Sequence, residues 1–376
     1  NMQRKKNRNI SRHCESIASV YWNMKRRIAL HRMKMKKWIA GIALGSMMLL
    51  AGCGGGSGSG GSAAGEGSAA AEANADALQI GIIQTQAHAA LDRAREGFEA
   101  GLEEAGYTVG EDVVIDYQNA QGDQSNLNTI TNQFASDKKD LVCAIATQAA
   151  VQMASASSDI PIVGTAITDY ESVGLVESND APGGNVTGTS DMNPIADQVA
   201  LMQQLMPDLS SVGVMYCSAE ENSRIQFELF KEECEAAGIS VTEMTVSNVN
   251  EIQQAATSLI GEDIQAIYVP TDNTLASAMT TLTGVTNEAK IPVFTGEVGM
   301  LSGGGTATVS VDYYELGKQT GAMAAQILKG EAEPATMAIE MPANNTTEIN
   351  QEEVDLLGIT VPDELAEFVG DYAAEE

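Results

Sequence analysis

The feature that most constrains the fold of this chain is an internal repeat. Residues Gly81–Gly106 match residues Gly213–Gly238 at a constant offset of 132 positions, with Phe98 falling on Phe230. A repeat of this length determines the architecture before any local motif is considered. The chain is therefore predicted to form two similar lobes, and the interface between two such lobes is a favoured place for a small ligand.

Short apolar runs alternate with segments of helical spacing along each copy of the repeat. Leu78–Gln84 predicts a strand buried on both faces, and Leu91–Ala105 predicts the helix that follows it. Strands that alternate with helices indicate parallel sheets with helices on both faces. We expect an α/β fold of two Rossmann-like lobes, because the folded part, roughly 300 residues, is too long for one small core.

The lobes are predicted to exchange segments through hinge crossings. We assign residues 78–190 and about 300–330 to the first lobe, and residues 191–299 and about 331–376 to the second. In this assignment the strand Thr306–Val311 and the helix Tyr314–Leu328 return to the first lobe, and the chain crosses back near Glu331–Pro334.

Residues 1–52 are predicted to be a signal peptide, with the residues before Met24 an over-extended start. Basic residues precede a 13-residue apolar run, Trp38–Leu50, which is shorter than the ~20 residues needed to span a bilayer. The run ends in L-A-G-C, which resembles a bacterial lipobox and implies cleavage before Cys53 and a lipid on its thiol. The alternative is an uncleaved anchor with an incidental cysteine.

Residues 53–77 are rich in Gly, Ser and Ala and are predicted to be a flexible tether after the lipidated Cys53. A lipid with a tether anchors a protein to a membrane without spanning it. We therefore expect an exported protein on the outer face of the cytoplasmic membrane, or on the periplasmic side of an envelope membrane.

The charge balance excludes several classes of partner. The first 52 residues hold 12 of the 21 basic and 1 of the 51 acidic residues, which leaves 9 and 50 and a net charge near −41. A chain this acidic is a poor candidate for binding nucleic acid or anionic lipid headgroups.

The remaining cysteines and histidines do not suggest a metal or a cofactor. Cys143, Cys217 and Cys234 have no regular spacing, and His88 is the only histidine after residue 52. Irregular cysteines argue against a disulfide framework or a zinc site. We predict no metal, no cofactor and no catalytic residue.

Ligands of parallel sheets bind beyond the carboxyl ends of the strands, so the loops at those ends supply the candidate site. The candidate ligand-binding residues are Gln84, His88, Thr147, Ala149, Thr168, Asp169, Tyr216, Asn222, Ser223, Asp272, Asn273, Glu297 and Asp312.

These residue types suit a zwitterionic ligand. Asp169, Asp272, Glu297 and Asp312 could bind an ammonium group, because charge-assisted hydrogen bonds are strong. The helices that open at Asn222-Ser223 and at Thr147–Ala149 offer free N–H groups to a carboxylate. Three tyrosines could pack against an apolar or aromatic side chain: Tyr170, Tyr216 and Tyr313.

Structural alternatives stay open for several of these residues. Thr168-Asp169 and Asp272-Asn273 precede helices and could serve only as N-caps. His88 could be a surface or hinge residue, and Tyr313 a core residue. The ligand-binding hypothesis predicts that Asp272→Ala weakens binding with near-normal folding.

Several segments together resemble the substrate-binding lipoproteins of one family of ABC importers. They are I-G-I-I-Q, N-A-Q-G-D, A-I-A-T-x-A-A, P-G-G-N-V-T-G-T-S-D, E-N-S, Y-V-P-T-D-N and D-Y-x-x-L-G. The resemblance covers nearly the whole chain after Leu78 and implies the type I periplasmic-binding-protein fold. It also implies an aromatic or other apolar amino acid as ligand: tryptophan, phenylalanine or tyrosine. Many relatives have a proline where this chain has Ala89.

The predicted function is that of a solute receptor, not an enzyme. A monomer would close its lobes on the ligand and dock on a membrane permease. Its ATPase would be another chain, since no P-loop motif is present. Acidic residues of Glu99–Glu104 and Glu232–Glu235 could dock on the permease, or could be solvated helix faces. The alternative function is a sensor that presents the same ligand to a membrane receptor.

Overall fold

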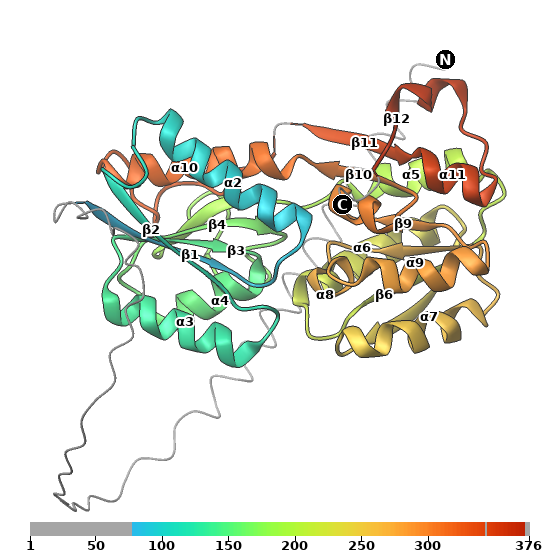
Figure 1. The fold of residues 1–376 in the computed structure, drawn as a ribbon, viewed down its shortest axis with the longest axis horizontal. Coiled ribbons are helices and arrows are strands. Elements are labelled where there is room, and N and C mark those ends of the chain that lie inside the picture. The colour runs from blue at the N-terminus through green and yellow to red at the C-terminus, as the bar shows by residue number, and fades with distance from the viewer. Residues whose placement is uncertain (1–76, 343, 373–376) are drawn as a thin grey trace, which may run out of the picture. The chain divides into compact units, whose positions relative to one another are not determined.

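The computed structural model describes residues 77–342 and 344–372, which form two α/β lobes (Figure 1). The predicted signal peptide, the tether and Cys53 lie outside these residues. No helix within the described ranges is long and apolar enough to cross a bilayer.

The first sheet has five parallel strands in the order β2-β1-β3-β4-β5. Its strands are β1 (Leu78–Gln84), β2 (Val113–Asn119), β3 (Leu141–Ile145), β4 (Ile162–Ile167) and β5 (Val186–Ser190). Four helices cover it: α2 (Ala89–Glu104), α3 (Gln124–Asp137), α4 (Thr147–Ala156) and α10 (Tyr313–Leu328). Figure 1 shows α2 and α10 on one face and α3 and α4 on the other.

The second sheet has seven strands in the order β12-β11-β10-β9-β8-β6-β7, parallel except where β10 meets β11. Its strands are β6 (Ser211–Cys217), β7 (Ser240–Val246), β8 (Ala266–Val269), β9 (Val293–Thr295), β10 (Ala307–Val311), β11 (Asn345–Asn350) and β12 (Val369–Gly370). Its helices are α5 (Ile195–Leu205), α6 (Glu221–Ala236), α7 (Ile252–Ile260), α8 (Asn273–Ala276), α9 (Met279–Glu288) and α11 (Gln351–Leu357). Three 3₁₀ turns complete the lobe: η1 (Val249–Glu251), η2 (Val298–Gly303) and η3 (Asp363–Phe368).

The internal repeat has a physical basis in the two sheets. The order β2-β1-β3-β4 in the first recurs as β7-β6-β8-β9 in the second. Gly81 of β1 and Gly213 of β6 occupy equivalent places. A Cβ atom there would lie 2.7 Å from the ring of Phe134 and 2.8 Å from the side chain of Leu259, respectively. Each glycine therefore makes room for a side chain of a covering helix, and the prediction of two similar α/β lobes is confirmed.

The strand β10 belongs to the second lobe, whereas the sequence predicts it in the first. β10, expected in the first lobe, pairs with β9 and with the antiparallel β11 in the second sheet, and only α10 returns to the first lobe. The chain then stays with the first sheet beyond the predicted crossing at Glu331–Pro334. The N–H of Glu340 donates to the carbonyl of Gly188, and the Glu340 carbonyl accepts from the N–H of Ser190. The crossing to β11 thus follows Glu340.

Four glycines bring α2 and α10 into backbone contact. Cβ atoms at Gly97 and Gly101 of α2 would lie 2.0 Å and 2.3 Å from carbonyl oxygens of α10. Cβ atoms at Gly317 and Gly321 of α10 would lie 2.1 Å and 2.4 Å from carbonyl oxygens of α2. No side chain fits between the helices at these four positions.

We expect Gly101→Ala to destabilise the protein by about 3 kcal/mol, because the new methyl group overlaps the Lys318 carbonyl. The matched control is Gly284→Ala in α9, where a Cβ meets no atom within 4 Å. That change should stabilise the helix by up to about 1 kcal/mol. Urea unfolding of the two variants measures both effects, and equal stabilities would contradict the close packing of α2 on α10.

Candidate functional site

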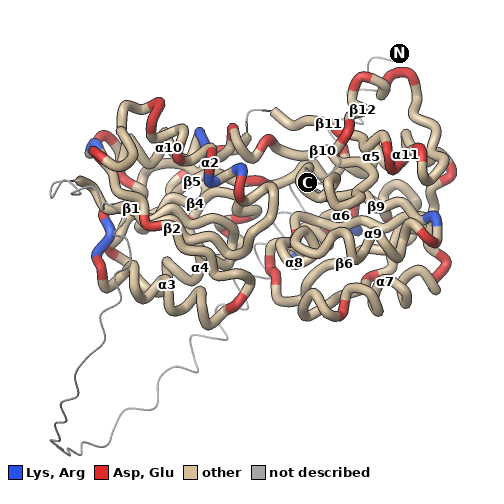
Figure 2. The backbone as a smooth tube through the Cα atoms, in the orientation of Figure 1, with Lys and Arg blue, Asp and Glu red and all other residues tan. Residues whose placement is uncertain are grey.

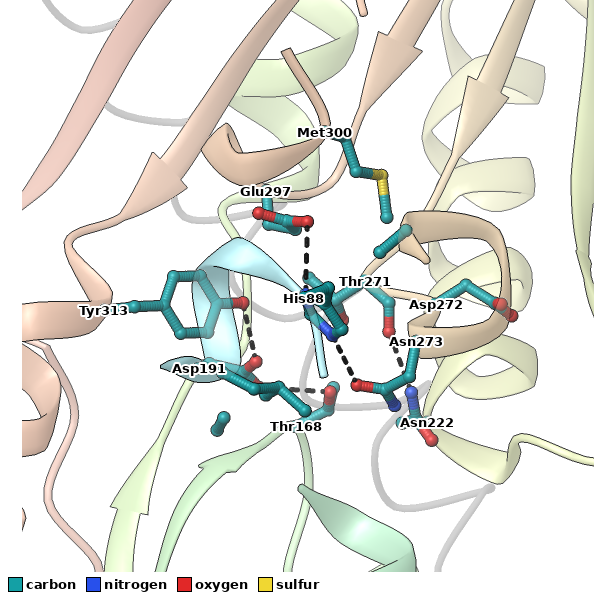
Figure 3. Close-up of a pocket in the computed structure, with 13 residues that line it drawn as sticks. His88, Thr168, Asp191, Asn222, Thr271, Asp272, Asn273, Glu297, Met300 and Tyr313 are labelled. Carbon is teal, nitrogen blue, oxygen red and sulfur yellow. Dashed lines mark hydrogen bonds and ion pairs between the residues drawn. The ribbon is translucent and has the colours of Figure 1, made fainter. Parts of the chain in front are cut away.

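A pocket lies between the two lobes, at the carboxyl ends of the strands of both sheets (Figure 3). The space among its side chains, including the part open to solvent, amounts to about 280 Å³. We call it the interlobe pocket; it is lined by His88, Leu91, Ala166, Thr168, Asp191, Asn222, Thr271, Asp272, Asn273, Ala276, Glu297, Met300 and Tyr313.

Six of the thirteen residues chosen from the sequence line this pocket. They are His88, Thr168, Asn222, Asp272, Asn273 and Glu297. Each comes from a loop or helix start that follows a strand, since parallel strands end at the same edge of their sheet.

Four candidates in the first lobe lie outside the pocket because their side chains serve the lobe itself. The Gln84 amide donates to the Asp92 carboxylate at 2.8 Å and to the Gln86 carbonyl at 2.8 Å. Thr147 and Ala149 are buried in the first turn of α4. The Asp169 carboxylate accepts from the N–H of Ser172 at 3.0 Å.

Asp312 caps α10 by accepting from the N–H groups of Tyr314 and Glu315, and it too lies outside the pocket. Two candidates of the second lobe are also elsewhere. The ring of Tyr216 stacks on Phe227 with centroids 5.4 Å apart. Ser223 is fully buried and donates to Asp272 at 2.7 Å.

The residues that the sequence selection missed include a second buried acid. Asp191 directly follows β5 and is only 3% exposed. It ends the segment P-G-G-N-V-T-G-T-S-D, which contributes to the family resemblance but not to the candidate site; the rule of strand ends would have identified it. The other missed residues are Thr271 and the apolar Leu91, Ala166, Ala276 and Met300, whereas Tyr313, one of the three tyrosines considered for packing against the ligand, does line the pocket.

Asp191 connects the two lobes through a chain of hydrogen bonds. Its carboxylate accepts from the Tyr313 hydroxyl at 2.8 Å and from the Thr168 hydroxyl at 3.2 Å. Thr168 accepts in turn from the Gln226 amide of α6 at 3.3 Å, and Gln226 also donates to Thr271. Tyr313 is thus a pocket residue as well as a buried one.

His88 reaches from the first lobe to two residues of the second. Its Nε2 lies 3.1 Å from Oδ1 of Asn273, and its Nδ1 lies 4.0 Å from Oε1 of Glu297. Figure 3 shows the imidazole between these two side chains. His88 is therefore a pocket residue at the interface of the lobes.

Asp272 lines the pocket, but its carboxylate is occupied by its own lobe. One oxygen accepts from the Leu275 N–H at 2.8 Å, and the other accepts from the Cys217 N–H at 2.6 Å and the Ser223 hydroxyl at 2.7 Å. Burial, with a contribution from Glu220, raises its pKa, and the three donors oppose that rise. The geometry favours the structural alternative, in which Asp272 caps α8 and ties it to β6.

Three buried polar atoms of the pocket have no hydrogen-bond partner. They are Nδ1 of His88, Oδ1 of Asn222 and Oε1 of Glu297. Buried polar atoms are nearly always paired in native proteins, so unpaired ones around a cavity indicate the groups that a ligand would satisfy. Two of the three atoms are oxygen acceptors, which call for a ligand that donates hydrogen bonds.

The electrostatics of the pocket also favour a cationic group. Burial raises the pKa of Asp191 and raises that of Glu297 from 4.5 to about 7, whereas burial lowers the pKa of His88. No Lys or Arg is among the described lining residues. A ligand ammonium would offset the cost of burying the ionised Glu297 carboxylate.

The described part of the chain contains no group of three or more His, Cys, Asp or Glu residues placed to hold a metal ion. Its cysteines Cys143, Cys217 and Cys234 are buried and unpaired.

Comparisons with known proteins agree on one family. A sequence profile of the family described as ABC transporter substrate binding protein matches residues 79–371. The chain is 42% identical over 253 residues to the Tyrosine-binding protein of Clostridioides difficile (strain R20291), which covers 67% of this chain and 73% of that protein.

Two solved structures of similar sequence differ in whether a ligand is bound. The ABC domain in complex with L-Trp from Streptococcus pneumonia matches with a TM-score of 0.76 and 39% identity, over 78% of this chain and 99% of that one. A ligand-free, open substrate binding protein from Clostridium difficile matches with a TM-score of 0.63 and 38% identity, over 79% and 100%. The described structure is thus more similar to the ligand complex than to the open form.

We expect Asp272→Asn to lower the free energy of unfolding by about 3 kcal/mol, because its amide would face donors that are now paired with a carboxylate oxygen. The same loss of hydrogen bonds replaces the expectation from the sequence that Asp272→Ala folds nearly normally. Asp312→Asn is the matched control: it changes an exposed N-cap to an equally good one and should have little effect. Thermal unfolding that left both variants equally stable would restore Asp272 as a free ligand carboxylate.

Glu297 should make stability depend on pH. Its pKa of about 7 in the folded state exceeds its ordinary value of 4.5, so stability is lost as the pH rises from about 4.5 to 7. The loss is on the order of 3 kcal/mol. Since Asp191 and His88 also face this region, the difference between wild type and Glu297→Gln isolates the carboxyl group.

Denaturant unfolding at pH 5 and pH 8 measures this difference. Glu297→Gln should gain stability relative to wild type at pH 8, and Glu288→Gln, at an exposed position of α9, should not. A difference between wild type and Glu297→Gln that stayed constant with pH would contradict the raised pKa.

Proposed function

The chain belongs to the ABC transporter substrate-binding protein family, and we propose that it binds an aromatic amino acid between its lobes and delivers it to a membrane permease. The family and the fold agree with the expectation of a type I periplasmic binding protein. Proteins of this family are receptors on the outer side of the cytoplasmic membrane, which is the role proposed for this chain.

One observation carries the choice of an amino acid: the unpartnered Oε1 of the buried Glu297, in a pocket lined by acids and by no Lys or Arg among the described residues. An ammonium group supplies both the missing donor and the missing positive charge. The unpartnered Oδ1 of Asn222 provides a second acceptor from the same lobe.

The apolar part of the pocket supports an aromatic side chain. Leu91, Met300 and Tyr313 are buried and line the same cavity as Glu297. Methionine sulfur and a tyrosine ring both make favourable contacts with aromatic rings. The relatives named for tyrosine and solved with L-Trp agree with this class of ligand.

Membrane attachment and delivery form the rest of the proposal. The L-A-G-C segment supports a lipid anchor at Cys53, and the missing P-loop supports a separate ATPase. Asp and Glu are spread over both lobes, with few Lys and Arg among them (Figure 2). Glu103 of α2 and Glu235 of α6 are exposed and stay candidates for docking on the permease, and the monomeric state stays a prediction.

We expect L-tyrosine, L-tryptophan or L-phenylalanine to raise the unfolding temperature of the full-length protein, because a ligand that binds only the native state stabilises it by mass action. At 100 times its Kd, such a ligand adds about 2.7 kcal/mol. Glucose, galactose, myo-inositol and adenosine should leave the temperature unchanged.

The role of Glu297 is tested by calorimetric titration at pH 8 with whichever of these amino acids stabilises the protein. Glu297→Gln should weaken binding by about 30-fold or more. Glu353→Gln, at a buried acid of the same lobe outside the pocket, should leave the affinity unchanged. Stabilisation by a sugar alone would refute the amino-acid proposal, and full affinity in Glu297→Gln would remove Glu297 from the site.

A further inference from the structure

A second cavity adjoins the interlobe pocket. We call it the outer chamber; it is lined by Ala87, His88, Ala89, Ala276, Ser277, Met279, Thr280, Glu297, Gly299, Ser302 and Gly303. It encloses about 610 Å³, including space open to solvent, and it shares His88, Ala276 and Glu297 with the interlobe pocket. These three residues mark the junction of the two cavities.

The two cavities differ in charge. The interlobe pocket has Asp191 and Asp272 in addition to Glu297, whereas Glu297 is the only acid among the described residues that line the outer chamber. The rim of the outer chamber carries the exposed residues Ser277, Thr280 and Ser302. Water and hydroxyl groups are therefore within reach of anything bound there.

The junction holds two of the unpartnered buried atoms. Nδ1 of His88 and Oε1 of Glu297 lack hydrogen-bond partners, and their side chains are 8% and 2% exposed. Both belong to residues that line both cavities, so a ligand that reaches either atom lies at the boundary between them. An ammonium group paired with Glu297 would thus be placed at the junction.

A carboxylate would be placed poorly in the interlobe pocket. It would lie near the buried acids Asp191 and Glu297 without a Lys or Arg among the described lining residues to offset them, and like charges repel strongly where water is excluded. An aromatic ring meets no such penalty there, because Leu91, Met300 and Tyr313 provide apolar surface. The ring, the ammonium group and the carboxylate of an aromatic amino acid are therefore favoured at different positions.

We propose that the ligand spans the junction, with its ring in the interlobe pocket, its ammonium group at Glu297 and its carboxylate in the outer chamber. This inference rests on the proposed binding of an aromatic amino acid. The carboxylate then adds little to recognition, and the receptor accepts ligands extended at that end. The ligand class is aromatic amines with a free ammonium group, including amino-acid amides and dipeptides with an aromatic first residue.

Calorimetric titration of the full-length protein tests this ligand class. The parent is whichever of L-tyrosine, L-tryptophan or L-phenylalanine binds most tightly, compared with its amide, its dipeptide with a C-terminal glycine and its N-acetyl derivative. The amide and the dipeptide should bind within about tenfold of the parent. The N-acetyl derivative should lose more than about 100-fold, because it removes the charge that pairs with Glu297.

The outcomes separate this inference from the proposed function. If the parent binds but the amide and the dipeptide lose 100-fold or more, the carboxylate is recognised in the pocket and the inference is wrong. If none of the three parents binds, the proposed function fails and the inference fails with it.

A pair of variants tests the place of the extension. Thr280→Trp puts a large side chain on the rim of the outer chamber, and Thr281→Trp puts the same side chain on the next exposed position of α9, outside both cavities. Thr280→Trp should weaken dipeptide binding by about tenfold and leave the parent within about threefold. Equal effects on the dipeptide and the parent, or equal effects of the two variants, would place the extension elsewhere.

Discussion

The backbone contact between α2 and α10 is the constraint on which the site depends. His88 immediately precedes α2, and Tyr313 is the first residue of α10. Because Gly97 and Gly321 leave no room for a side chain between the helices, the two helix starts are held at one distance from each other. Two pocket residues that are 225 positions apart in the chain are thereby positioned as a unit.

The site itself is built around buried carboxyl groups that the protein satisfies to different extents. Asp272 has three donors and Asp191 has two hydroxyl groups, whereas one oxygen of Glu297 has no hydrogen-bond partner. A carboxylate oxygen that already accepts hydrogen bonds from the protein is not available to a ligand. Only the incompletely satisfied group is available to a ligand, which is why Glu297 and not Asp272 emerges as the candidate for recognition.

The sequence was sufficient for the architecture and for about half of the residues that line the interlobe pocket, and the differences have physical causes. The repeat predicts both lobes because its glycines are required by helix packing at equivalent places. It does not predict the lobe of β10, since that depends on which sheet edge is free and on pairing with β11. Asp272 and Glu297 look alike in sequence as acids after strands, and only the donors that surround each carboxylate distinguish them.

The position of Tyr313 has a mechanical consequence. A single residue, Asp312, separates β10 of the second sheet from α10, which packs on the first, so Tyr313 lies at a crossing between the lobes. When two lobes turn about a crossing, atoms near the crossing move little and atoms far from it move more. Contacts near Tyr313 would persist when the lobes open, whereas His88 would approach Glu297 only when the lobes are fully closed. A ligand would contact the region of Tyr313 first, and the approach of His88 to Glu297 would enclose it last.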